Sequence, residues 1–117
     1  MVVDDDQDLA EMLGIVLTSS GFDVDLVSRG DEALEVFRNN PPDLVLLDVM
    51  LPGKSGFDIL RDLRADPEMQ ALPVLMLTAR GQTRDRELAE KLGVNRFITK
   101  PFSNAEVIEN VRALVAG

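Results

Sequence analysis

Short apolar runs alternate with longer amphipathic stretches along the whole chain, and this alternation most restricts the folds that the chain can adopt. Runs rich in Val, Leu and Ile predict strands, whereas apolar residues recurring at helical spacing predict helices. Strands that alternate with helices in this way form βα units around a parallel sheet. We therefore expect an α/β protein with five strands and five helices.

The expected boundaries follow from the apolar runs and from the Gly, Pro and Asn residues between them. Strands are expected at about 1–3, 22–26, 44–47, 74–78 and 96–99, and helices at 7–20, 31–39, 56–65, 83–92 and 103–115. The run 44–47 is wholly apolar, which is typical of a central parallel strand covered on both faces. The segment 22–26 alternates apolar and acidic residues, which indicates an edge strand. The first run is shorter than the usual strand of about five residues, so we expect a trimmed N-terminus.

The composition excludes several classes of function. A chain of 117 residues is long enough for one domain, so we expect a single domain over 1–117. This domain can belong to a longer protein. The chain contains neither Cys nor His, which excludes thiol nucleophiles, disulfides and imidazole ligands. With 21 acidic and 12 basic residues its net charge is −9, which opposes direct binding to nucleic acid. Neither a membrane span nor a signal peptide is visible, so we expect a cytoplasmic protein without membrane contact.

Polar side chains stand where the predicted strands end. Asp4 and Asp5 follow the first strand, and Asp48, Thr78 and Lys100 follow three others. Open parallel sheets place their ligand sites at this carboxyl edge. Carboxylates about 4 Å apart repel by roughly 4 kcal/mol at an effective dielectric constant near 20, so a cation must join them. An all-oxygen site with few protein ligands suits Mg²⁺, and Lys100 can supply further positive charge.

Four segments of the chain together resemble the receiver domain of two-component response regulators. The segments are Val2–Asp6, Leu44–Gly53, Leu75–Ala79 and Ile98–Phe102. The intervals fit that family: 43 residues from Asp5 to Asp48, 30 from Asp48 to Thr78 and 22 from Thr78 to Lys100. The resemblance covers essentially the whole chain. It implies a doubly wound, flavodoxin-like (βα)5 sheet with strand order 2-1-3-4-5.

The resemblance also implies the chemistry of the site. Asp48 would accept a phosphoryl group from a phosphohistidine, on a sensor histidine kinase or on a histidine phosphotransfer protein. Mg²⁺, or Mn²⁺ in its place, would be bound by Asp5, by Asp48 and by the backbone carbonyl of Met50, with Asp4 binding directly or through water. The domain would thus be a signalling phosphoacceptor that catalyses only its own phosphorylation and dephosphorylation.

Further residues take roles in the switch that the resemblance implies. Lys100 and Thr78 would contact phosphoryl oxygens, small Ala79 would leave access for the donor, and Lys100-Pro101 is a candidate cis peptide bond. Phe97 matches the aromatic residue expected to turn inward when Thr78 moves, although packing in the core explains a Phe equally well. The helix 83–92, the strand 96–99 and the helix 103–115 would form the surface for a downstream protein, an output domain or a phosphorylation-dependent dimer. The same mixed charges also suit a solvated face.

The chain departs from the family pattern at two places, and two other functions remain to be compared with the receiver interpretation. Asn95-Arg96 stands where receivers of the winged-helix transcription-factor subclass carry an acidic pair, which argues against a DNA-binding output. Met50 and Arg80 occupy positions that tune the lifetime of the phosphate, in a direction that the sequence does not give. A pseudo-receiver that binds partners without phosphorylation is opposed by the complete acidic, Thr and Lys set. A haloacid-dehalogenase-type hydrolase is opposed by Gln7-Asp8 where that class needs Gly followed by Thr or Val.

Overall fold

The computed structural model describes residues 1–49, 51, 53–78 and 83–116. Five strands and five helices alternate in this part of the chain, as the sequence predicts. In chain order they are β1 (Val2–Val3), α1 (Gln7–Ser19), β2 (Leu26–Val27), α2 (Gly30–Asn39), β3 (Val45–Asp48), α3 (Gly56–Ala65), β4 (Val74–Thr78), α4 (Thr83–Leu92), β5 (Arg96–Thr99) and α5 (Asn104–Ala116).

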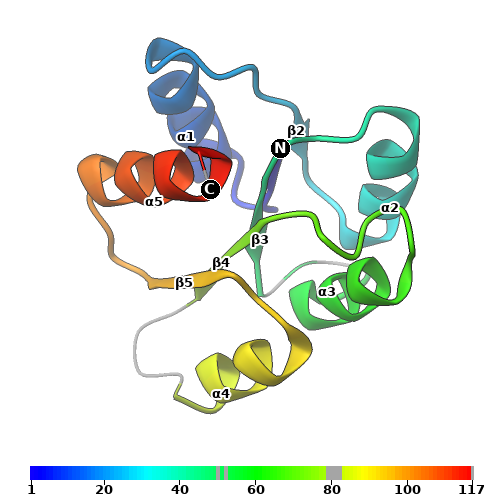
Figure 1. Cartoon of the computed structure of the whole chain (residues 1–117). Helices are drawn as coiled ribbons and strands as arrows, with labels where there is room; N and C mark the ends of the chain where they lie inside the picture. Colours follow the sequence, from blue (N-terminus) through cyan, green and yellow to red (C-terminus); the bar gives the residue numbers. More distant parts are fainter. Residues whose placement is uncertain (50, 52, 79–82, 117) are drawn as a thin grey trace.

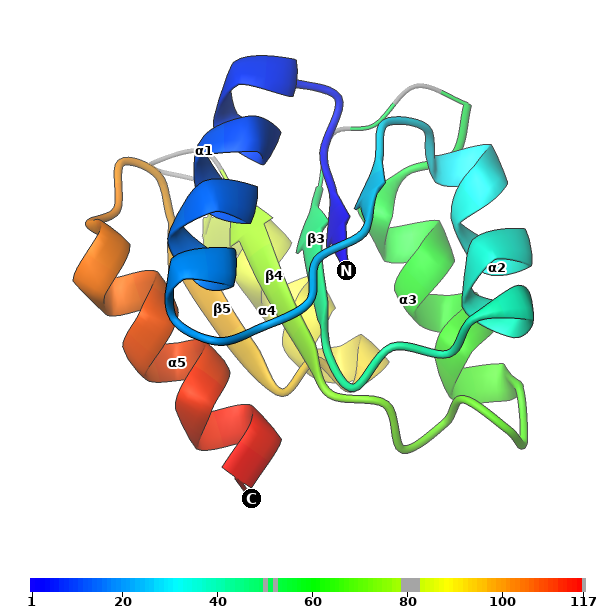
Figure 2. The ribbon, with the colours of Figure 1, turned by 90° about the horizontal axis from the view of Figure 1, so that it is seen from above.

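The strands form one parallel sheet in the order β2-β1-β3-β4-β5. Helices α1 and α5 lie on one face of the sheet, and α2, α3 and α4 lie on the other (Figures 1 and 2). The predicted doubly wound topology is therefore confirmed. Since the chain reverses its winding direction after β2, β1 and β3 are neighbours at the centre of the sheet. Their carboxyl ends border the crevice where ligands of such sheets bind.

Alternating side chains of the central strands fill two separate apolar cores. Val45, Leu47 and Met76 belong to the core beneath α2, α3 and α4, whereas Leu46 and Leu75 belong to the core beneath α1 and α5. Successive residues of a strand point to opposite faces, so an unbroken apolar run can serve both cores at once. All residues of β3 and β4 are accordingly buried.

Side chains cap the starts of two helices, α1 and α5. The Asp6 side chain accepts a hydrogen bond from the amide of Leu9 at 3.2 Å, at the start of α1. Ser103 accepts one from the amide of Glu106 at 3.1 Å, at the start of α5. Such caps satisfy backbone donors that the first helical turn leaves without partners. Asp6 is thus a helix cap and not a member of the acidic cluster.

The prediction of the second strand was wrong in position. It was expected at 22–26, but β2 comprises only Leu26–Val27. Phe22 and Val24 are half-buried against the core beneath α1 and α5 without strand pairing. An edge strand pairs on one side only, so its length follows that of β1, which itself has two residues. Side-chain alternation therefore continued beyond the part of the segment that has a partner.

Candidate functional site

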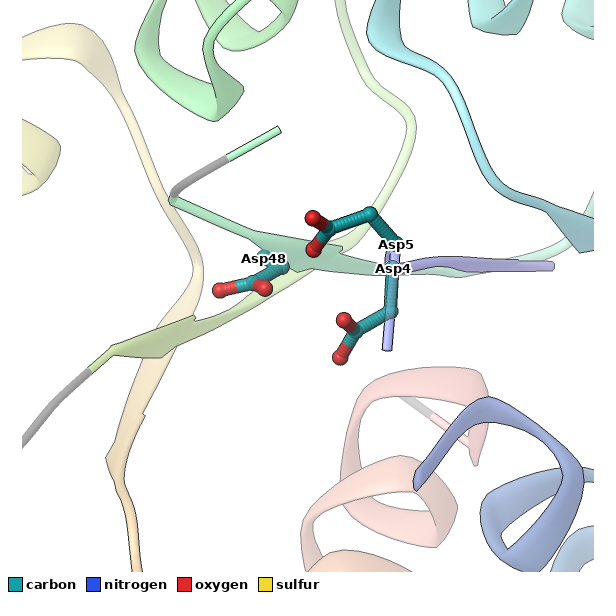
Figure 3. Close-up of side chains that lie close together, drawn as sticks. All are labelled: Asp4, Asp5 and Asp48. Carbon is teal, nitrogen blue, oxygen red and sulfur yellow. The ribbon is translucent and has the colours of Figure 1, made fainter. Parts of the chain in front are cut away.

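The carboxyl ends of β1 and β3 bring three aspartates together. Val3 pairs with Leu47, so the residues that follow them, Asp4 and Asp48, leave the sheet side by side. Asp5 comes next along the chain. One carboxylate oxygen from each of the three side chains lies within 4.8 Å of the other two. Figure 3 shows these carboxylates gathered at the ends of the two strands, as the sequence predicts.

Burial raises the free-energy cost of keeping the carboxylates of this cluster ionised. The exposed fraction is 1% for Asp4 and 6% for Asp48, whereas Asp5 is exposed. One Asp4 oxygen, Oδ1, accepts a hydrogen bond from the amide of Asp6 at 3.0 Å. The other, Oδ2, is buried and has no hydrogen-bond partner among the described residues. A buried acceptor without a partner costs about 1–3 kcal/mol, so this oxygen is suited to a ligand.

Lys100 provides a positive charge at the edge of the cluster. Its Nζ lies 3.5 Å from Oδ2 of Asp48 and 3.8 Å from Oδ2 of Asp4. The Lys100 amide also donates to the carbonyl of Thr78 at 2.7 Å, which fixes the end of β5 against the end of β4. The peptide bond between Lys100 and Pro101 is cis, as the resemblance implies. One ammonium against three carboxylates leaves a local excess of two negative charges when all are ionised.

The pKa of Asp4 lies above its usual value. Burial is the main cause that raises it to about 6, and the neighbouring Asp48 carboxylate adds to the rise. The hydrogen bond from Asp6 and the charge of Lys100 act in the opposite direction. The folded chain therefore holds a proton at Asp4 more tightly than an exposed aspartate does. A divalent cation bound here would displace that proton.

The residues present fit a hard divalent cation. Carboxylate oxygens from Asp4, Asp5 and Asp48, with space for water on the exposed side of Asp5, are the donor set that Mg²⁺ or Mn²⁺ prefers. The buried Asp4 oxygen without a partner adds an independent reason for a ligand at this place. Met50, whose carbonyl was predicted to join the site, lies outside the described residues, as do Ala79 and Arg80.

Thr78 and Phe97 lie on the same face of the sheet. Thr78 is the last residue of β4 and is 2% exposed. Its hydroxyl lies 3.5 Å from Oδ2 of Asp85 in α4. Phe97 pairs in register with Met76 and packs, half-buried, against the core that α4 covers. The structure thus describes Phe97 as a core residue next to α4, and its predicted switch role stays a prediction.

Sequence reasoning missed two residues that contact the predicted site. Gly56 starts α3 directly against the backbone of Asp48: a Cβ there would lie 2.2 Å from the Asp48 carbonyl oxygen. Asp85 is the other, through its contact with Thr78. A glycine after a loop and an acidic residue in a first helical turn are both common, so neither carried a signal. Only the packing of α3 and α4 on the sheet reveals them.

A flavodoxin-like α/β protein with a buried acidic crevice at the carboxyl edge of its sheet is the class that fold and site define. Comparison with known proteins narrows this class. Residues 1–112 match the family model of the response regulator receiver domain. The chain therefore belongs to the receiver domains of two-component response regulators, and it is a signalling module.

Curated relatives agree with this assignment. Over 113 residues, 97% of this chain and 48% of the relative, it is 49% identical to the DNA-binding response regulator MtrA of Mycobacterium tuberculosis (strain H37Rv). It is 42% identical over 114 residues to the phosphate regulon transcriptional regulatory protein PhoB of Rhizobium meliloti, again with 97% of this chain and 50% of the relative covered. The chain thus spans about half the length of these relatives.

Solved structures share the fold. A candidate response regulator from Chloroflexus aurantiacus superimposes with a TM-score of 0.95 at 37% identity, covering 99% of this chain and 95% of that one. The signal receiver domain of a histidine kinase from Syntrophus aciditrophicus gives 0.93 at 31% identity, with 99% and 88% covered. None of the described helices is long and apolar enough to cross a membrane.

Proposed function

We propose that the Asp48 carboxylate of this receiver accepts a phosphoryl group from a phosphohistidine. An oxygen of Asp48 forms the new P–O bond, the P–N bond of the phosphohistidine breaks, and the electron pair returns to the imidazole of the donor. The product is an aspartyl phosphate. The observation that carries this proposal is the placement of Asp48, 6% exposed, between the other two carboxylates and the ammonium of Lys100.

Each neighbouring group has a defined task in this proposal. Asp4, Asp5 and Asp48 hold the cation, which neutralises charge on the phosphoryl oxygens when bound. Lys100, 3.5 Å from Asp48, pairs with another phosphoryl oxygen. Thr78 donates its hydroxyl to a third. Phosphoryl transfer needs positioning and charge neutralisation more than covalent help from the protein, so this set of groups is sufficient.

The partners follow from the same chemistry. The donor is a sensor histidine kinase or a histidine phosphotransfer protein, since the proposed reaction takes the phosphoryl group from a phosphohistidine. The added group carries about −1.5 to −2 charges, which can bias a neighbouring element. We propose that α4, β5 and α5 pass this change to an output domain, a downstream protein or a second receiver. The name of the relative MtrA, a DNA-binding response regulator, favours a DNA-binding output domain in a longer protein.

The proposal is tested by incubating the chain with Mg²⁺ and acetyl phosphate and measuring its intact mass. The wild-type chain is expected to gain one phosphoryl group, and the Asp48→Asn variant none. Asp43→Asn is the matched control, because Asp43 is exposed at the opposite end of the same strand. Equal labelling of wild type and Asp48→Asn would show that another residue is the acceptor. No labelling of the wild-type chain would favour a pseudo-receiver.

A further inference from the structure

The contact between Thr78 and Asp85 joins the end of the sheet to the first turn of α4. The Thr78 hydroxyl lies 3.5 Å from Oδ2 of Asp85. Thr78 is 2% exposed and Asp85 is half-buried, so water competes weakly for this hydroxyl. The hydroxyl is a donor and the carboxylate an acceptor, so the pair is chemically complementary at this separation.

The direction of Thr78 follows from the strand. Val74 and Met76 belong to the core beneath α2, α3 and α4, and Thr78 is next in the same alternation. Its side chain therefore leaves the sheet on the face that α4 covers. Asp48, by the same rule, alternates with Leu46, which belongs to the opposite core. The hydroxyl thus starts on the side of Asp85 and not on that of Asp48.

Helix α4 has a weak apolar attachment to the sheet. Ala89 is fully buried and Leu92 is partly buried against the core, whereas Leu88 is 37% exposed. An element with few buried apolar contacts can shift at low cost in free energy. A single polar contact at its first turn can then contribute a large share of what holds that turn in place.

We propose that Asp85 is the resting acceptor of the Thr78 hydroxyl and competes with the phosphoryl group on Asp48 for it. A hydroxyl has one hydrogen and donates to one acceptor at a time. When Thr78 turns to the phosphoryl group, Asp85 loses its donor and the first turn of α4 is released. Asp85 is thus a positioning residue that sets how readily phosphorylation reaches α4. This inference rests on the proposed function of Asp48 and Thr78.

Binding of beryllium fluoride with Mg²⁺, a mimic of the phosphoryl group, measures this competition. Titration calorimetry is suitable, because the chain has no Trp for a fluorescence assay. Asp85→Ala is expected to bind the mimic roughly 3- to 10-fold more tightly, because the variant lacks one hydrogen bond that competes for the Thr78 hydroxyl. Asp85→Asn keeps an acceptor oxygen without the charge, so its affinity should lie between those of wild type and Asp85→Ala.

A double-mutant cycle separates this role from a general effect of charge on the helix. Acidic residues stabilise any helix start, and Asp58 occupies the same place in the first turn of α3. Asp58→Ala is therefore the control and should leave the affinity unchanged. In a Thr78→Ala background, Asp85→Ala should have no further effect. The proposal is overturned if Asp85→Ala behaves like Asp58→Ala, or if its effect persists without Thr78.

Amide hydrogen exchange of the metal-free chain gives a readout that does not depend on phosphorylation. Thr78→Val and Asp85→Ala should each speed exchange of the amides in the second turn of α4, which donate to carbonyls of the first turn, by about the same factor, and the double variant should be no faster. If the wild-type chain neither binds the mimic nor gains phosphate, the proposed function of Asp48 fails. Unchanged exchange in both single variants would instead refute the contact itself.

Discussion

The two ends of the central sheet each carry three aspartates, yet they differ in burial. Asp4, Asp5 and Asp48 meet at the carboxyl end, where two of the three are almost fully buried. At the amino end, Asp23, Asp25 and Asp43 line a hollow of about 370 Å³, and all three are exposed. Among the described residues, only the carboxyl-end group lies close enough to hold a cation.

This difference shows that the number of acidic residues does not define a site. Exposed carboxylates are hydrated, and their mutual repulsion is screened by water and salt. Buried carboxylates lack that screening, so the free energy of their repulsion is stored until a proton or a cation joins them. The chain keeps Asp4 and Asp48 in this costly environment, with Oδ2 of Asp4 lacking a hydrogen-bond partner among the described residues. Four predictions test the contrast between the two ends.

The largest expected effect concerns space around the backbone. Gly56→Ala should destabilise the fold by about 3 kcal/mol or more, because the new Cβ would meet the Asp48 carbonyl oxygen at 2.2 Å. Gly21, which lines the amino-end hollow, has nothing within 4 Å of such an atom. Its φ of 96° still makes Gly21→Ala cost about 1–2 kcal/mol. Urea unfolding measures both, and equal losses would contradict the tighter packing at the carboxyl end.

The pH dependence of stability is the second test. In the folded, metal-free chain the pKa of Asp4 rises from 3.8 to about 6, mainly through burial. The folded state then binds this proton more tightly than the unfolded state does. The resulting stability is complete below about pH 4 and is lost as the pH rises through 6, by about 3 kcal/mol. Urea unfolding in EDTA should show this loss in the wild-type chain and not in Asp4→Asn.

Asp23→Asn is the control for that measurement. Asp23 is exposed at the amino end, so its removal should leave the difference between pH 4 and pH 7 unchanged. If Asp4→Asn retains the full pH dependence of the wild-type chain, the raised pKa of Asp4 is not its source.

The effect of Mg²⁺ on thermal stability is the third test. Mg²⁺ at ten times its dissociation constant should stabilise the chain by about 1.4 kcal/mol, which corresponds to roughly 5 °C in Tm. EDTA should reverse the gain, and Asp48→Asn should lose most of it. Asp23→Asn, at the amino end, should retain it. A gain of equal size in Asp48→Asn would place the bound cation elsewhere on the acidic surface.

The smallest expected effect is the removal of the amino-end charges themselves. Replacing Asp23 and Asp43 together by Asn should change the free energy of unfolding by less than about 0.5 kcal/mol per site, because exposed charges contribute little. Urea unfolding at pH 7 measures this change. A decrease of more than about 2 kcal/mol in the free energy of unfolding of the double variant would show that these exposed aspartates also stabilise the fold.

The sequence predicted one edge of the sheet to the residue, with β5 at 96–99, and misplaced the other edge. The bounds of β4 at 74–78 and of α3 at 56–65 were also predicted to the residue, because Pro73 precedes the strand, Gly56 ends the loop before the helix and the apolar spacing marks their length. The second strand was misplaced, since β2 depends on how far β1 extends beside it.

Some residues of the site could be predicted from the sequence, and others could not. Asp4, Asp5, Asp48 and Lys100 could be predicted to meet, because parallel strands place their carboxyl ends at one edge whatever the details of packing. Asp85 and Gly56 could not be predicted. Their contacts depend on the distance and rotation of α4 and α3 against the sheet, which many side chains decide together.

By itself, the order of apolar and polar residues determined the class of fold, the edge of the sheet that carries the chemistry and the residues that meet there. These properties depend on the period and the ends of local elements, which short stretches of sequence encode. Only the tertiary structure decided which carboxylates are buried, which oxygen lacks a hydrogen-bond partner and where Thr78 directs its hydroxyl. These properties depend on desolvation and contact between elements far apart in the chain, and no local pattern contains them.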